Sequence, residues 1–157
     1  MGKLQHIQHQ IAAINHLIEI NNDRIAGYEK ILDEKQEYRY SEIFDQNVSE
    51  SQKGIAELSD LIRDMGGQPS TGTSFGNKVS QTWFDIKSQI KKPDNMSILG
   101  KCIHIEEVVN AAYRKALDDK ELIWDDKKVI SVLSNHLKLS KMALDKIKGL
   151  YTENLSV

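Results

Sequence analysis

Apolar residues recur at alternating spacings of three and four along most of the chain, a pattern typical of helices that bury one face in a bundle. Such spacing predicts helices over about 3–33, 40–65, 96–117 and 122–151. In the first stretch the apolar positions are Leu4, Ile7, Ile11, Ile14, Ile18, Ile25, Tyr28 and Leu32. The sequence therefore predicts an all-α protein with four long helices.

Two of the connections between these helices are short. Charged residues at 33–39 and at 118–120 form them, so the helices on either side of each turn should be antiparallel neighbours. Gly66 and Gly67, with Pro69 close behind, are expected to end the second helix.

The third connection, about 67–95, is too long for a tight turn. It begins with Ser, Thr, Gly and Pro, and a short amphipathic helix that contains Trp83 is predicted over 75–90. A connection of this length suits a crossover along the bundle, which makes the second and third helices parallel. We therefore predict one domain, residues 1–157, folded as a ferritin-like antiparallel four-helix bundle with the crossover between helices 2 and 3.

Some positions on the predicted buried faces are polar. Counting inward from the turns, at equal rise per residue, places them at similar heights in the bundle. A buried carboxylate needs a partner or a proton, and His136 is the expected partner of Glu106. With His136 or Ser140 as its partner, Glu106 should tolerate replacement by Gln. The polar positions are Asn21, Ser51, Glu106, His136 and Ser140.

Two interpretations of this layer compete, a hydrogen-bonded layer that fixes helix register and a metal or acid–base site. Ferritin-like di-iron sites use a Glu from each of two helices and a Glu-x-x-His from each of the other two. No histidine of this chain has Glu three residues before it, and the second predicted helix has no histidine. We therefore expect no catalytic residue, cofactor or metal site. Glu106 and His136 are the alternative candidates for holding iron or manganese.

Composition limits the partners and the compartment. The 23 Asp and Glu residues nearly balance the 21 Lys and Arg residues, and without a basic stripe no nucleic-acid partner is expected. No apolar stretch approaches the about 20 residues of a membrane span, and the start has no signal-peptide pattern. The single cysteine, Cys102, fits a reducing compartment. We expect a cytoplasmic protein with no membrane partner.

Segments spread over nearly the whole chain carry a resemblance to a known family. They are 17–25, 27–30, 65–69, 83–87, 98–99 with Cys102, 106–113 and 145–148. In these segments the chain resembles a bacterial family of ferritin-like four-helix-bundle proteins of unknown function. The resemblance implies an oligomeric, cytoplasmic bacterial protein and, for the ferritin-like group at large, an iron site.

Three positions depart from that family's pattern. Members tend to carry a carboxylate directly after the third-helix cysteine, a histidine before the fourth-helix aspartate and an acidic residue before Gly27. This chain has Ile103, Leu144 and Ala26 there, while Glu106 is retained. If the family binds metal through those positions, this chain is expected to have lost the site.

The sequence thus predicts a non-catalytic bundle that acts as a self-associating structural or interaction module, in the simplest case a homodimer. The start of the first helix, with His6, His9 and His16, and the apolar flank of the fourth helix offer surface for that contact. The alternative is a ferritin-like oxidoreductase that binds iron or manganese at a degenerate site around Glu106 and His136. The sequence names no other protein partner.

Overall fold

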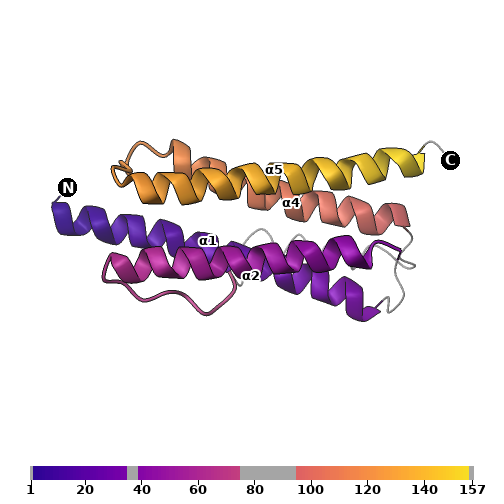
Figure 1. The fold of residues 1–157 in the computed structure, drawn as a ribbon, viewed down its shortest axis with the longest axis horizontal. Coiled ribbons are helices and arrows are strands. Elements are labelled where there is room, and N and C mark those ends of the chain that lie inside the picture. The colour runs from indigo at the N-terminus through magenta and orange to yellow at the C-terminus, as the bar shows by residue number, and fades with distance from the viewer. Residues whose placement is uncertain (1, 35–38, 75–94, 156–157) are drawn as a thin grey trace.

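The computed structural model describes residues 2–34, 39–74 and 95–155, and four helices make up its secondary structure (Figure 1). They are α1 (Lys3–Glu34), α2 (Ser41–Asp64), α4 (Asn95–Asp118) and α5 (Lys127–Leu155). The predicted all-α class is confirmed. The short helix predicted over 75–90, with Trp83, lies outside the described residues. In the described ranges, no helix combines the length and the apolar content needed to cross a membrane.

Each helix packs against two antiparallel neighbours, α1 against α2 and α4, and α5 against α4 and α2 (Figure 1). At one end of the bundle the Lys128 ammonium of α5 lies 3.1 Å from the Asp64 carboxylate, which ends α2. At the other end the Asn154 amide donates to the Tyr40 hydroxyl at 2.9 Å. Because α5 is antiparallel to both α2 and α4, these two run parallel, as predicted for a bundle with a crossover.

Two apolar clusters fill the bundle, one on each side of a polar layer. Along α1, Ile20 belongs to the first cluster and Tyr28 to the second, with Asn21 and Arg24 between them. The first cluster consists of Ile14, Leu17, Ile18, Ile20, Leu58, Leu61, Ile62, Val109, Tyr113, Ala116, Val129 and Leu133. The second consists of Tyr28, Ile31, Tyr40, Phe44, Ile98, Leu99, Cys102, Ile105 and Ile147.

The end of α2 has the geometry that its two glycines predict. Gly66 has a φ of 82°, in the left-handed region. The Gly66 N–H donates to the carbonyl of Arg63 at 3.0 Å, and the Gly67 N–H donates to that of Ile62 at 2.9 Å. These two bonds form a Schellman motif, which satisfies carbonyls that the last turn of a helix leaves without partners.

The first part of the crossover, residues 68–74, lies along α1. The side-chain amides of Asn15 and Asn22 donate to backbone carbonyls of this segment, at 3.0 and 2.8 Å. The carboxylate of Asp23 accepts from the backbone N–H of Ser74 at 3.2 Å and from the Ser74 hydroxyl. Polar side chains of α1 therefore fix where the crossover starts.

The predicted start of the fourth helix near Leu122 is wrong, since α5 begins at Lys127. Ile123 has a φ of 44°, which a helix does not allow. The Asp126 carboxylate accepts the backbone N–H of Lys128 at 2.8 Å and so caps the helix. The apolar residues before Lys127 continue the helical periodicity, so the pattern predicts a start that is too early. The Asp126 cap marks the observed start of α5.

Replacing Gly66 by Ala should lower the free energy of unfolding by about 1–2 kcal/mol, because a side chain is disfavoured in the left-handed region. Gly149 is the matched control, since it lies inside α5 with no atom within 4 Å of an added Cβ. Gly149→Ala should raise stability by about 0.5–1 kcal/mol through helix propensity. Urea unfolding measures both, and a stabilising Gly66→Ala would contradict the cap geometry.

A second prediction concerns Asp23. Burial raises the pKa of its carboxyl to about 6, with the Ser74 N–H acting in the opposite direction and the Glu19 carboxylate adding to the rise. In the unfolded chain the carboxyl titrates near 3.8. Between these values the unfolded state has released the proton that the folded state retains, so stability falls as the pH rises through this window.

Urea unfolding of wild type and Asp23→Asn from about pH 3.5 to pH 7 should therefore diverge. As the pH rises, the free energy of unfolding of wild type should fall by about 1–3 kcal/mol more than that of the variant, because the amide side chain of the variant cannot titrate. A stability difference that stays constant across this range would show that Asp23 does not titrate in the folded protein as stated.

Candidate functional site

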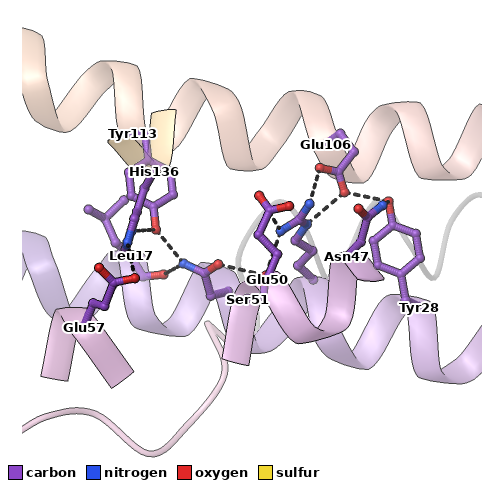
Figure 2. A network of polar contacts seen from close by, with 11 residues as sticks. Leu17, Tyr28, Asn47, Glu50, Ser51, Glu57, Glu106, Tyr113 and His136 are labelled. Carbon is purple, nitrogen blue, oxygen red and sulfur yellow. Dashed lines mark hydrogen bonds and ion pairs between the residues drawn. The ribbon is translucent and has the colours of Figure 1, made fainter. Parts of the chain in front are cut away.

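An ion pair between α1 and α4 forms the centre of the polar layer (Figure 2). The Arg24 guanidinium donates from Nε to Oε2 of Glu106 at 2.9 Å and from Nη2 to Oε1 at 2.8 Å. The two side chains are 2% and 0% exposed. Burial alone lowers the pKa of Arg24, but the Glu106 carboxylate raises it above its ordinary value, so the guanidinium stays charged. This bidentate geometry is the strong form of a charge-assisted hydrogen bond.

A third donor also occupies the Glu106 carboxylate. The Tyr28 hydroxyl donates to Oε2 at 2.6 Å, and the Asn47 amide of α2 donates to the Tyr28 oxygen at 3.1 Å. Burial, followed by the charge of Glu106, raises the pKa of Tyr28 well above its ordinary value, so the phenol keeps its proton. Both oxygens of Glu106 are therefore engaged by side chains of α1.

On its other side Arg24 begins a hydrogen-bond chain that reaches all four helices (Figure 2). Its Nη1 donates to the Ser51 hydroxyl at 3.0 Å, and that hydroxyl donates to Oδ1 of Asn21 at 2.9 Å. The Asn21 amide nitrogen donates to the Tyr113 hydroxyl at 2.9 Å. The Tyr113 oxygen lies 3.0 Å from Nδ1 of His136 on α5.

These hydrogen bonds determine which ring nitrogen of His136 carries the proton. Asn21 also donates to the Leu17 carbonyl at 2.8 Å, which fixes the amide orientation, so the Tyr113 oxygen accepts from Asn21. The Tyr113 proton then points to Nδ1 of His136 and leaves the imidazole proton on Nε2. Burial lowers the pKa of His136, against the opposing effect of Glu57, so the ring is neutral at pH 7. Its Nε2 lies 3.5 Å from Oε1 of Glu57 and has no hydrogen bond within the described residues.

The predicted polar layer is confirmed, since the structure buries every residue assigned to it from the sequence. The Ser140 hydroxyl differs from the others because it has no hydrogen-bond partner in the described ranges. The buried residues are Asn21, Ser51, Glu106, His136 and Ser140.

The predicted partner of Glu106 is wrong. Glu106 bonds to Arg24 and Tyr28. His136 bonds to Tyr113 instead, and the Ser140 hydroxyl has no hydrogen bond in the described ranges. An arginine long enough to cross from α1 supplies both the charge and the fork geometry that a buried carboxylate requires.

The spacing of residues in the first helix indicates that Arg24 is buried. The predicted face of the first helix used Ile25 and began at Leu4, but Leu4 is 69% exposed and Ile25 is half-buried. The buried face instead passes through Arg24, at regular spacings of three and four, along Ile14, Leu17, Asn21, Arg24, Tyr28 and Ile31.

The three histidines near the start of α1 differ in their surroundings. His6 Nε2 lies 2.9 Å from the Leu122 carbonyl in the loop before α5, so its ring contacts the same chain. His16 is exposed, and His9 is half-buried. Cys102 is fully buried, and burial raises the pKa of its thiol well above the ordinary value.

The residues of the layer do not fit a di-iron centre. Such a centre uses several carboxylates and two histidines that project inward from the four helices. Here the Arg24 cation and Tyr28 occupy the Glu106 carboxylate, and Glu106 and His136 have separate partners. In the described part of the chain, no three His, Cys, Asp or Glu residues lie together as a metal site would need.

Comparison with known proteins gives a family and a fold. The family model described as "Domain of unknown function (DUF2383)" matches residues 9–119. No curated protein matches the sequence. A solved structure described as ferritin-like, diiron-carboxylate proteins from Bacillus anthracis str. Ames is similar, with a TM-score of 0.70 and 15% sequence identity. The match covers 96% of this chain and 99% of that chain. The ferritin-like four-helix bundle is therefore confirmed.

The ion pair predicts that replacing Glu106 is costly. Glu106→Gln should lower the free energy of unfolding by about 3–5 kcal/mol, because Arg24 keeps a buried charge without a counter-charge. This reverses the mild effect expected for a His136 or Ser140 partner.

The double variant Arg24→Met with Glu106→Leu removes both charges. It should be more stable than either single variant, because apolar side chains of similar volume often replace a buried ion pair at little cost. Urea unfolding of wild type, Arg24→Met, Glu106→Leu and the double variant gives the coupling energy of the pair. Additive effects of the two single changes would contradict a direct ion pair.

Proposed function

This chain belongs to the family described as a domain of unknown function (DUF2383), and we propose that it is a non-catalytic ferritin-like bundle protein. In this proposal it self-associates as a homodimer and acts as a structural or interaction module. No metal or other cofactor takes part in its role.

The Arg24–Glu106 ion pair is the observation that supports this proposal most strongly. The similar Bacillus anthracis structure is described as a diiron-carboxylate protein, and the core carboxylates of such a protein neutralise metal charge. In this chain the guanidinium supplies the positive charge at the core carboxylate of α4 through two bonds of 2.9 and 2.8 Å. A cation that entered would meet the charge of Arg24 and would have to displace it.

Exposed apolar side chains support self-association. On α5, Met142 is 59% exposed, Leu155 is 64% exposed and Leu139 is 36% exposed. At the start of α1, Leu4 is also exposed. Exposed apolar side chains gain stability when a second copy removes them from water, and two-fold pairing is the commonest assembly.

The proposal also includes a bacterial source and a cytoplasmic location. The single, fully buried Cys102 supports the location, because it suits a reducing compartment.

The test is to purify the protein from iron-supplemented cells and to measure its metal content and its mass in solution. We expect substoichiometric iron and manganese, a melting temperature that added Fe(II) or Mn(II) leaves unchanged, and twice the chain mass by light scattering at tens of micromolar. The similar Bacillus anthracis protein, prepared in parallel, is the comparison for metal content.

The control is the double variant Arg24→Met with Glu106→Leu, which lacks the core carboxylate. Two irons per wild-type chain, with oxidation of added Fe(II), would overturn the proposal and support the metal-binding oxidoreductase. Loss of that iron in the double variant would assign it to Glu106. A monomer in light scattering would remove the homodimer from the proposal.

A further inference from the structure

A pocket of about 50 Å³ opens between α2 and α5, beside the polar layer. Gly54 leaves room for this pocket. A side chain at this position would fill space beside the His136 ring, because its Cβ would lie 3.5 Å from Cε1 of the ring. A water molecule needs about 10–15 Å³ of such space. The pocket therefore has room for roughly three to four water-sized groups.

Two buried polar atoms at this pocket have no hydrogen bond in the described ranges. They are Nε2 of His136 and Oγ of Ser140, on residues that are 6% and 2% exposed. A buried polar atom without a hydrogen bond costs about 1–3 kcal/mol. By the tautomer assigned above, His136 Nε2 carries a proton. Oε1 of Glu57, at 3.5 Å, lies beyond the usual distance of an N–H···O bond, so a closer acceptor would satisfy this proton. The Ser140 hydroxyl both donates and accepts.

Two carboxylates give the pocket wall an excess of negative charge. Glu50 and Glu57 are seven residues apart on α2, and both line the pocket. The cation nearest Glu50 is Arg24, at 3.7 Å, but Glu106 already neutralises its charge. Glu57 faces the neutral His136 ring. Lys53, also on the wall, is exposed, and no ion pair joins it to either carboxylate.

These features favour a ligand that carries both a positive charge and a hydrogen-bond acceptor. The carboxylates favour a cation and oppose an anion such as a phosphate or an amino-acid carboxylate. The His136 Nε2–H requires an oxygen that accepts. An ammonium group alone meets only the first requirement, and a neutral alcohol meets only the second.

We propose that this pocket binds a small primary β-amino alcohol. Its ammonium group donates to Glu57, and its hydroxyl oxygen accepts from His136 Nε2. The Ser140 hydroxyl completes the contacts. A two-carbon amino alcohol has four heavy atoms, which matches the size of the pocket. The binding site does not depend on the proposed function, because it requires neither a dimer nor the absence of metal.

The test is a titration of the full chain with 2-aminoethanol hydrochloride at constant ionic strength, followed by NMR of the Gly54 backbone amide. We expect a saturable shift. Ethylammonium and ethylene glycol, which lack the hydroxyl and the charge respectively, should each bind about tenfold more weakly, because each leaves a buried group without its partner.

Variants assign the contacts. Glu57→Gln should weaken binding about tenfold or more, and Ser140→Ala about fivefold. Glu57 is 40% exposed, so its replacement should leave the fold intact. Asp45→Asn is the matched control, since it removes one charge from an exposed position of the same helix outside the pocket and should bind as wild type does.

Three results would overturn the proposal. One is a shift that stays linear in concentration or is equal for all three probes. Another is unchanged binding in Glu57→Gln and Ser140→Ala. The third is a saturable response to Zn(II) or Mn(II) without one to 2-aminoethanol, which would make the pocket a metal site.

Discussion

The structure depends on one interaction, the buried ion pair between Arg24 and Glu106 at the centre of the bundle. The two hydrogen bonds fix the height of α1 against α4, because a shift by one residue would leave two buried charges apart. The apolar clusters on either side contain no charged residue. They therefore supply stability, while the ion pair selects the register.

The rest of the polar layer extends this constraint to the other two helices. Ser51 and Asn47 connect α2 to the ion pair, and Tyr113 connects the network to His136 of α5. The hydrogen-bond chain ends at His136, whose Nε2 has no hydrogen bond, and the Ser140 hydroxyl at the same pocket also has none in the described ranges. The same network that makes the core specific on one side thus leaves polar atoms for a ligand on the other.

Much of this arrangement follows from the sequence. Periodicity predicts the four helices, paired glycines predict the end of α2, and polar residues on apolar faces predict the buried layer. Periodicity does not predict the partner of Glu106, because the adjacent positions Arg24 and Ile25 both lie near the buried face and an apolar pattern favours Ile25. The pocket was not predictable either. It depends on the spacing of α2 and α5 and on a histidine tautomer that a side chain of α4 sets.

The state of the Arg24 guanidinium tests the central claim most directly. NMR of its Nε–H, in protein treated with a chelator, should show a single signal that exchanges slowly with water, because the group is buried and bonded to Glu106. Adding paramagnetic Mn(II) should leave that signal unchanged. A signal that exchanges as fast as that of an exposed arginine, or that broadens as Mn(II) binds, would contradict a core built on this ion pair.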